Sequence, residues 1–314
     1  MTSLWIRMGV AAAVMLSTGA AAAEEMTKLR INRSPVSTFQ GLIIAQEKGW
    51  FKENGIEVEL AIGTSPDAAI AELVAGQSQI AMTGGVTLVA AVATGVPVTA
   101  VINGQDDGNV PTHGLLVKAD SGLQKITDLK GKKIGLPGIA SPQGLYLLEA
   151  LEKAGMSRDD VELVNLPFPG VTQAIESGAV DAGIPIGLFF DFGKAAGLTE
   201  LPEYAEQVMV GVPAVFFAAN KNWAEENAEV LTKFVAVMQK AHDWANENPD
   251  EVRRIDMENT KLPPEYLKTR PYAGLQSAFN TELWSKQVEG LSKHGFISRA
   301  PATDEYVWSG APRK

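Results

Sequence analysis

The side chains that most often carry out chemistry in proteins are few in this chain and widely spaced. There are 3 histidines and 0 cysteines among its 314 residues. The histidines are His113, His242 and His294, and no two have the H-x-x-x-H spacing that places two metal ligands on one helical face. The lack of cysteine excludes disulfides, thiolate metal sites, a cysteine nucleophile and a lipid-modified N-terminal cysteine. The sequence therefore predicts no metal centre and no thiol chemistry.

Acidic and hydroxyl side chains also lack a catalytic pattern. Asp106-Asp107 and Asp159-Asp160 have the residue type needed for acid–base work. The second pair follows a predicted helix and is expected to face solvent, whereas the first lies in a polar loop that forms either a cleft rim or only a turn. Ser141 lies in G-x-x-S-x-x-G, which lacks the G-x-S-x-G nucleophile turn. No phosphate-binding loop, dinucleotide fingerprint or calcium loop is present, so we expect no cofactor, and nothing requires an enzyme.

Binding chemistry is suggested by the stretch "GLPGIASPQGLYLLEALEKAG" at residues 135–155. A short apolar strand, residues 133–136, leads through small and polar residues into an amphipathic helix. Ser141 or a neighbour can cap this helix, and Pro142 suits its first turn. Because the N–H groups of a helix start attract anions and polar ligands, the loop is either a ligand cradle or only a well-capped helix.

The elements that would position these residues alternate between strand and helix. Apolar alternation predicts strands, and helical periodicity predicts the segments between them. Short loops join the elements, which favours a parallel-type α/β sheet. The predicted strands are 28–32, 56–62, 79–83 and 96–102, and the predicted helices are 39–51, 66–77 and 86–95.

The pattern then recurs, which suggests two similar lobes. Gln40-Gly41-Leu42 aligns with Gln143-Gly144-Leu145, and Gly76 aligns with Gly178. Any two βαβαβ stretches resemble each other to some degree, but the shared Q-G-L at a matched position favours a true repeat. Since ligands of open α/β sheets bind beyond the carboxyl ends of the strands, the two matched helix starts are expected to face one ligand in a cleft between the lobes.

The remainder of the chain is expected to complete this arrangement. Residues 208–223 contain an apolar strand that crosses back between the lobes, and residues 227–249 form a long amphipathic helix. Residues 261–274 read as a connector interrupted by prolines, and the tail after Ser298 has weak structural signals. His242 on the long helix is expected to be a surface or packing residue, while His113 at the crossing either approaches the cleft or only packs there.

The N-terminal 23 residues are expected to be a secretory signal peptide. Arg7 precedes an apolar run, and Ala21-x-Ala23 suits cleavage before Glu24. The alternative is a membrane anchor, for which the run is short. The formal net charge of −10 argues against nucleic acid, because an acidic surface repels phosphates. We therefore expect a mature chain that is soluble in the periplasm.

Several segments resemble one family, the periplasmic substrate-binding proteins of ABC importers, in the branch that serves taurine, alkanesulfonates, nitrate and thiamine precursors. The resemblance rests on "GLIIAQEKGWFKENGIEVEL" (41–60), "AIAELVAGQSQIAMTGG" (69–85), "ITDLKGKKIGLP" (126–137), "LYLLEALEKAGMSRDDVELVNLP" (145–167) and "AIESGAVDAG" (174–183). It implies an α/β fold of two lobes, residues 24–112 plus 213–314 and residues 113–212, that close on a solute by a hinge motion. It also implies a monomer that docks on a membrane permease with its ATPase.

The resemblance further implies that the pocket loops follow the strands. Arg33 either pairs with a carboxylate or sulfonate or is a rim charge, and Arg270 beside Tyr272 is a weaker candidate for the same role. Phe39 and Phe168 either wall off an apolar part of the pocket or pack beneath it. The candidate ligand-binding residues are Arg33, Ser34, Thr38, Phe39, Gln40, Thr64, Ser65, Thr83, Gly84, Gly85, Ser141, Gln143, Gly144, Phe168, Gly170, Pro185 and Gly187.

The nature of the solute stays open between two classes. The first is a small anion such as a sulfonate, a carboxylate or nitrate. However, sulfonate binders often carry a Trp-x-Pro stretch where this chain has Ile184-Pro185-Ile186-Gly187, and few basic residues lie near the loops. A neutral heteroaromatic such as a pyrimidine is the alternative.

Two further alternatives concern the class of protein. Eukaryotic relatives on this fold make a thiamine pyrimidine, but they depend on a cysteine-rich motif that is absent here. A sensory receptor in place of the permease is the other alternative.

Overall fold

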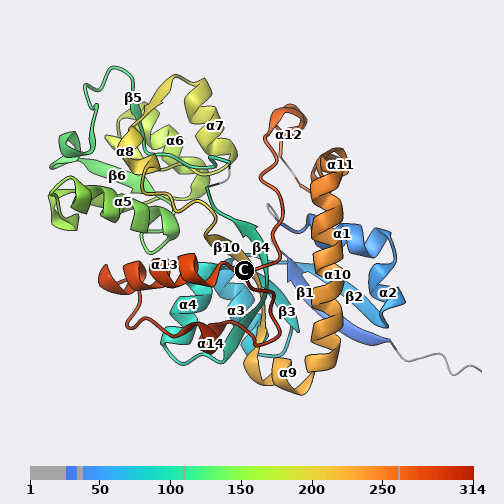
Figure 1. Cartoon of the computed structure of the whole chain (residues 1–314). Helices are drawn as coiled ribbons and strands as arrows, with labels where there is room; N and C mark the ends of the chain where they lie inside the picture. Colours follow the sequence, from blue (N-terminus) through green and yellow to red (C-terminus); the bar gives the residue numbers. More distant parts are fainter. Residues whose placement is uncertain (1–25, 34–37, 109, 261) are drawn as a thin grey trace, which may run out of the picture.

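Two five-stranded sheets form the frame of the molecule (Figure 1). The computed structural model describes residues 26–33, 38–108, 110–260 and 262–314. The expected signal peptide and Ser34 therefore lie outside the described residues, as does the side chain of Phe168. The first sheet has the order β2-β1-β3-β10-β4 and consists of β1 (Thr27–Arg33), β2 (Ile56–Ile62), β3 (Ile80–Gly84), β4 (Val98–Asp106) and β10 (Pro213–Asn220).

The second sheet has the order β7-β6-β8-β5-β9. Its strands are β5 (Leu116–Lys118), β6 (Lys133–Leu136), β7 (Glu162–Asn165), β8 (Ala182–Gly183) and β9 (Leu198–Glu200). Strands of the first sheet come from residues 27–106 and 213–220, and those of the second from residues 116–200. The lobe boundaries at 112/113 and 212/213 themselves stay predictions.

The two sheets share one plan of strand order and direction. In the first, β1 is parallel to β2 and β3, and β10 is antiparallel to β3 and β4. In the second, β6 is parallel to β7 and β8, and β5 is antiparallel to β8 and β9. The two-lobed α/β fold expected from the repeat is thus confirmed. The aligned glycines also correspond, since Gly76 and Gly178 follow matched helices with φ of 69° and 75°.

Helices cover both sheets. Those that precede β5 or follow β10 are α1 (Gln40–Glu47), α2 (Trp50–Glu53), α3 (Pro66–Val74), α4 (Gly85–Ala93), α9 (Lys221–Glu226), α10 (Ala228–Glu247), α11 (Pro249–Asn259), α12 (Pro264–Thr269), α13 (Thr281–Lys293) and α14 (Thr303–Tyr306). Those of the second lobe are α5 (Pro142–Lys153), α6 (Phe168–Ser177), α7 (Leu188–Ala195) and α8 (Pro202–Ala205), with 3-10 turns at Ile126–Leu129 and Arg158–Asp160.

Two sequence expectations about elements were wrong. The single helix expected over 39–51 is two helices, because Gly49 has a φ of 75° and breaks the first one. The tail after Ser298 is well packed rather than weakly structured. Tyr306 in α14 is fully buried, and Val307 forms a parallel bridge with Ala100 of β4.

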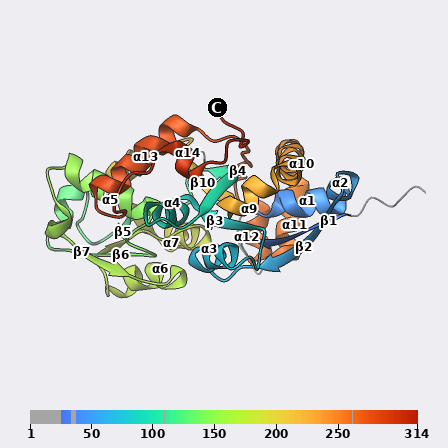
Figure 2. The same cartoon turned by 90° about the horizontal axis from the view of Figure 1, so that it is seen from below.

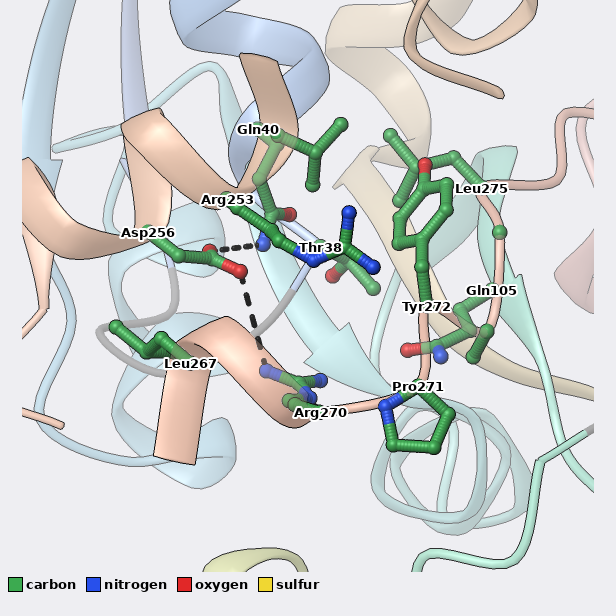
Figure 3. Close-up of a pocket in the computed structure, with 13 residues that line it drawn as sticks. Thr38, Gln40, Gln105, Arg253, Asp256, Leu267, Arg270, Pro271, Tyr272 and Leu275 are labelled. Carbon is green, nitrogen blue, oxygen red and sulfur yellow. Dashed lines mark hydrogen bonds and ion pairs between the residues drawn. The ribbon is translucent and has the colours of Figure 1, made fainter. Parts of the chain in front are cut away.

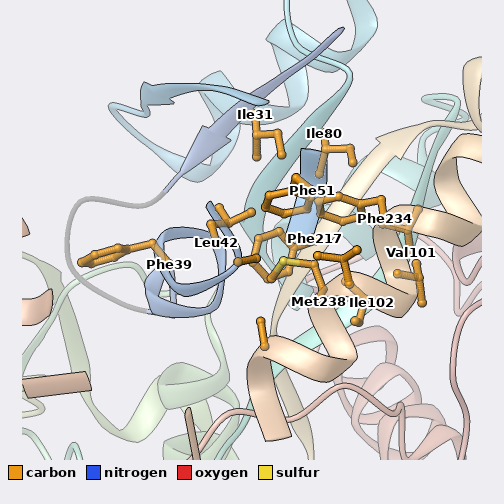
Figure 4. Close-up of a cluster of buried hydrophobic side chains, with 14 of the residues drawn as sticks. Ile31, Phe39, Leu42, Phe51, Ile80, Val101, Ile102, Phe217, Phe234 and Met238 are labelled. Atoms are coloured by element: carbon orange, nitrogen blue, oxygen red, sulfur yellow. The ribbon is translucent and has the colours of Figure 1, made fainter. Parts of the chain in front are cut away.

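One of the apolar cores of the first lobe lies between its sheet and the long helix α10 (Figure 4). Phe234 of α10 stacks on Phe51 with ring centroids 5.9 Å apart. His242, on the same helix, is 1% exposed, and this burial lowers its pKa to about 4. A Cβ at Gly41 would lie 2.6 Å from the His242 ring, so α1 approaches α10 this closely only with glycine there. The packing role expected for His242 is confirmed.

The crossing segments between the lobes are tied together by a buried polar network. The Asp107 N–H donates to the Val212 carbonyl at 2.7 Å, which joins the outgoing and returning segments. Tyr146 of α5 donates to Asp107 at 3.2 Å, and His113 lies 3.4 Å from the same carboxylate. Burial opposes ionisation of Asp107, but its contacts with His113 keep its pKa below the ordinary value. Asp107 therefore belongs to the network between the crossing segments, whereas Asp106 accepts from Asn103 and Lys314 at the end of β4.

Helix α13 forms a further link between the lobes, against α5 (Figure 2). Gln287 donates to the Tyr146 hydroxyl at 3.0 Å, and Lys293 donates to Glu152 at 2.6 Å. Leu145 of α5 belongs to the same apolar cluster as the α13 side chains. Within the described part of the chain, no helix combines the length and apolar character needed to cross a membrane.

Candidate functional site

A pocket opens on the first lobe where α1 begins, beside α11 and the segment that follows α12 (Figure 3). The space among its lining residues is about 400 Å³ when the adjoining open solvent is counted with it. All of its lining residues come from segments that precede β5 or follow β10. They are Thr38, Gln40, Gln105, Val252, Arg253, Asp256, Leu267, Arg270, Pro271, Tyr272, Ala273, Gly274 and Leu275.

Thr38 and Gln40 lie at the start of α1, and each has a buried polar side-chain atom. Thr38 has a φ of 56°, a left-handed conformation that a β-branched residue adopts only under constraint. Its side chain is 2% exposed, and its Oγ1 has no hydrogen-bond partner among the described residues. Gln40 donates from Nε2 to Asp256 at 2.5 Å, which leaves its Oε1 buried and without a partner there. Both atoms are thus buried without a hydrogen-bond partner in the described part of the protein.

Asp256 is the acidic group of the pocket. It lies on α11 with Val252 and Ile255, on the buried face of that helix, and is 7% exposed. Burial raises its pKa, an effect that the hydrogen bond from Gln40 and the charge of Arg270 partly offset. Its Oδ2 lies 4.0 Å from the Arg270 guanidinium. A carboxylate in this setting favours a ligand that donates hydrogen bonds.

Two guanidinium groups give the pocket positive charge and hydrogen-bond donors. Arg253 pairs through one Nη with the exposed Asp250 at 2.9 Å, while its buried Nε has no partner among the described residues. Arg270 closes the other side of Asp256 (Figure 3). The pocket thus presents acceptors at Asp256, Gln40 and Thr38 together with guanidinium donors.

Asn246 of α10 holds the far wall of the pocket in place. Its Oδ1 accepts from the Leu275 N–H at 2.8 Å and from the Tyr272 hydroxyl at 3.1 Å. Its Nδ2 donates to the Leu275 carbonyl at 2.9 Å. These bonds fix the ring of Tyr272 at the pocket, where it offers a flat aromatic surface.

Of the candidate residues near the start of the first lobe, two line the pocket and two are buried outside its lining. Thr38 and Gln40 line the pocket. Phe39 is fully buried beneath it, and the Arg33 guanidinium carbon lies 4.3 Å from the centre of its ring. Arg33 itself is 6% exposed, and burial lowers its pKa. Neither Arg33 nor Phe39 is among the lining residues.

The remaining first-lobe candidates lie at the starts of α3 and α4, away from this pocket. Thr64 and Ser65 are exposed, and Ser65 caps α3 by accepting from the Ala68 N–H at 3.1 Å. Thr83 is buried at the end of β3, and Gly84 is the N-cap of α4. A Cβ at Gly85 would lie 2.5 Å from the Trp284 ring, so this glycine is needed for packing.

The second-lobe candidates also lie outside the lining of the pocket. Ser141 accepts from the Gly144 N–H at 3.1 Å and donates to the Gly138 carbonyl at 2.7 Å, so its hydroxyl caps α5. A Cβ at Gly144 would overlap the Ile139 carbonyl oxygen. Gly187 has a φ of 58° and precedes α7. Gln143 and Gly170 lie in the first turns of α5 and α6, and Pro185 precedes α7. Their ligand contacts stay predictions.

Replacing Ser141 by alanine is expected to lower the free energy of unfolding by about 1 kcal/mol, because the N-cap hydrogen bond of α5 is lost. Urea denaturation measures this, and Ser65→Ala is the matched cap in the first lobe. If neither variant changes the free energy of unfolding, the capping role is contradicted. A loss of solute affinity in Ser141→Ala but not in Ser65→Ala would show that the hydroxyl also meets ligand.

Several pocket residues were not among the sequence candidates, notably Asp256, Arg253, Tyr272 and Gln105. Asp256 carried a usable signal, since it is a carboxylate one position after Ile255 and four after Val252, within the apolar stripe of a helix. Arg270 was named as a weak candidate, and the structure places it at the pocket.

Comparison with known proteins gives the family. Residues 36–252 match the family described as NMT1/THI5 like. The chain belongs to this family. Among curated relatives of this NMT1/THI5-like protein, a putative thiamine biosynthesis protein of Haemophilus influenzae is 29% identical over 85% of this chain and 86% of its own length. A formylaminopyrimidine-binding protein of Halalkalibacterium halodurans is 25% identical over 90% of this chain and 89% of its own.

Other similarities bear on the fold and on the range of activities. A Saccharomyces cerevisiae protein named as a 4-amino-5-hydroxymethyl-2-methylpyrimidine phosphate synthase is 25% identical over 84% of this chain and 81% of its own. Among solved structures, the periplasmic aliphatic sulphonate binding protein of Escherichia coli superimposes with a TM-score of 0.75 at 18% identity, covering 91% of this chain and 94% of that one. The NMT1/THI5-like protein therefore has the two-lobed periplasmic-binding-protein fold.

Proposed function

We propose that this protein is an extracytoplasmic binding protein that captures a small solute and delivers it to an ABC permease and its ATPase. One observation carries the proposal. Three buried polar atoms without a protein partner, Thr38 Oγ1, Gln40 Oε1 and Arg253 Nε, belong to residues that line the same pocket. Buried polar groups are normally paired, so a convergent unpaired set marks a site built for a polar ligand.

The solute is expected to carry N–H groups. Gln40 Oε1 and the Asp256 carboxylate accept hydrogen bonds and cannot donate them. Nitrate or a simple alkanesulfonate offers no donor for these acceptors, and Asp256 opposes its negative charge beside the two arginines that attract it. An aminopyrimidine offers an amino group for these acceptors, ring nitrogens for the arginines and a flat ring for Tyr272. The names of the Haemophilus and Halalkalibacterium relatives agree with this class.

A zwitterion such as taurine is the second candidate, because its ammonium suits Asp256 and its sulfonate suits Arg253 or Arg270. Taurine carries a sulfonate and so belongs to the first class of solute expected from the sequence. Its binding is expected to depend on the arginines, whereas binding of an aminopyrimidine is expected to depend on the ring of Tyr272.

Binding without catalysis is the proposed activity, despite the synthase name of the yeast relative. The chain contains 0 cysteines, and among the described residues those that line the pocket include no histidine or serine to pair as base and nucleophile. Mass spectrometry of solute recovered from the complex tests this. Recovery of unchanged solute supports binding, and a stoichiometric covalent or transformed product contradicts it.

The first experiment is a thermal-shift screen on the chain from Glu24, stripped of solute by unfolding and refolding. The panel holds formylaminopyrimidine, taurine, ethanesulfonate, nitrate and acetate. A true ligand at about 100 times its Kd adds about 2.7 kcal/mol of stability. A shift with the pyrimidine or with taurine selects between the two candidates. A shift with nitrate or ethanesulfonate alone would contradict the role assigned to Asp256.

Transport and location are tested separately. Sequencing the N-terminus of the exported protein is expected to give Glu24 as the first residue. Stimulation of the ATPase by the loaded protein in reconstituted liposomes supports delivery to a permease. A sensory receptor in its place would leave that ATPase unstimulated.

A further inference from the structure

Helix α12 makes a contact that reaches from the first lobe to the second. The ring of Tyr266 on α12 meets Phe192 of α7 edge-on, with centroids 6.4 Å apart and an interplanar angle of 62°. Burial, together with the nearby carboxylate of Asp191 one residue earlier on α7, raises the pKa of Tyr266 to about 12. Phe192 is 44% exposed, so it remains on the surface apart from this partner. In Figure 1, α12 rises from the first lobe toward α7.

The same helix forms part of the pocket. Leu267 and Arg270 line it, whereas Tyr266 does not. The Arg270 N–H donates to the Tyr266 carbonyl at 2.8 Å, so the two residues lie one helical turn apart on a rigid element. The segment beyond α12 is held to α10 by Asn246. A movement of α7 can therefore be transmitted from Tyr266 along one turn of α12 to Arg270, which lies beside Asp256.

The hinge lies on another side of the molecule. The crossing segments meet at Asp107 and Val212, and α13 packs on α5 through Gln287 and Tyr146. Figure 1 shows α5 and α13 at one side of the gap between the lobes and α12 at the other. A rotation that opens the lobes about the hinge therefore separates Tyr266 from α7.

We propose that Tyr266 is a positioning residue for solute binding, which holds α7 of the second lobe near the pocket without touching the solute. The inference rests on the proposed function, since it assigns regulation of the same site. It predicts that the contact biases the lobes toward closure and slows release of the solute.

The decisive experiment requires no solute. Because the chain has 0 cysteines, Glu53→Cys and Glu176→Cys place two spin labels on exposed positions of α2 and α6. Pulsed-dipolar distance measurement is expected to show a longer mean interlobe distance in Tyr266→Ala and in Phe192→Ala. The double variant is expected to add nothing beyond either single variant. Tyr266→Phe, which keeps the ring, is expected to shift less. Lys268→Ala, exposed on the same helix, is the control.

Two results would overturn the proposal: a Tyr266→Ala distribution that superimposes on the parent, or full additivity of the two alanine variants. Phe192→Ala serves as the second probe if Tyr266→Ala fails to fold, since it is a surface change in the other lobe. Stopped-flow release of formylaminopyrimidine is expected to be about 2- to 10-fold faster in Tyr266→Ala. If the parent binds no member of the panel, solute binding fails while the distances still decide the role of Tyr266.

Discussion

Asp256→Ala is expected to weaken solute binding by about 30-fold or more, the largest effect on affinity of any single change at the pocket. Truncating one partner of a buried, hydrogen-bonded charge pair costs roughly 2–5 kcal/mol. Asp256 is buried, accepts from Gln40 at 2.5 Å and faces the pocket. Isothermal titration with formylaminopyrimidine and with taurine measures the effect. Unchanged Kd values for a solute that binds the parent would contradict the assignment.

The carboxylate of Asp256 is expected to destabilise the folded protein, and the direction of its pKa shift determines how this effect changes with pH. Burial raises the pKa of Asp256 in the folded protein above its ordinary value. The folded state therefore binds more protons than the unfolded state between these two pKa values, and this group contributes less stability as pH rises through that window. Asp256→Asn removes the buried charge while keeping an acceptor for Gln40, so it is expected to raise the Tm at pH 7 and weaken binding.

Thermal melts across the acid range test this trade-off. As pH rises through the window between the two pKa values, the Tm of the parent is expected to fall because Asp256 ionises. The Tm of Asp256→Asn is expected to lack this part of the pH dependence. Asp243→Asn, an exposed change on α10, is the matched control and should change neither Tm nor affinity. A lower Tm in Asp256→Asn at pH 7 would show that Arg270 stabilises the carboxylate more than burial destabilises it.

Trp284→Ala is expected to lower the free energy of unfolding by about 3–5 kcal/mol, the largest effect on stability. Trp284 on α13 is 1% exposed and packs edge-on against Phe216 of β10 with centroids 5.0 Å apart. Its ring also covers Gly85 at the start of α4, so the cavity would open between three elements. Urea unfolding measures the loss, and Trp50→Ala on the half-buried α2 is expected to cost less.

A double-mutant cycle gives the sharper test of this packing. Gly85→Ala alone forces its methyl group into the Trp284 ring and is expected to destabilise the protein. Combined with Trp284→Phe, which frees space, the alanine is expected to cost less than it does alone. Additive costs would show that Gly85 and Trp284 do not share one packing site.

Much of the fold was predictable because it rests on local patterns that repeat. The alternation of strand and helix and the aligned Gln40-Gly41-Leu42 and Gln143-Gly144-Leu145 indicated two like lobes, and the sheets share one topology. The sequence did not reveal that the two aligned glycines serve different contacts. Gly41 lies against the side chain of His242, and Gly144 against the Ile139 carbonyl. The break at Gly49 was missed because the apolar periodicity continues across it.

The candidate site was predicted only in part, for a physical reason. The repeat pointed to Gln40 at the start of a matched helix, and the family resemblance pointed to Thr38 in the loop before it. Asp256 and Tyr272 lie in the unrepeated part of the chain and reach the pocket through tertiary packing of α10 and α11 against α1. Ser65, Ser141 and Gly85 occupy the expected turns, where the structure gives them caps and packing contacts.

The placement of β10 between β3 and β4 has a consequence for the order of folding during synthesis. All strands of the second sheet lie within residues 116–200, so that sheet can complete while the ribosome is still making the rest. The first sheet lacks an inner strand until residues 213–220 emerge. Until then β3 has an unpaired edge and β4 has no partner strand in the sheet. We therefore expect the second sheet to form before the first sheet is complete. The last, sequence-distant pairing is the step expected to limit the rate and to be most exposed to aggregation.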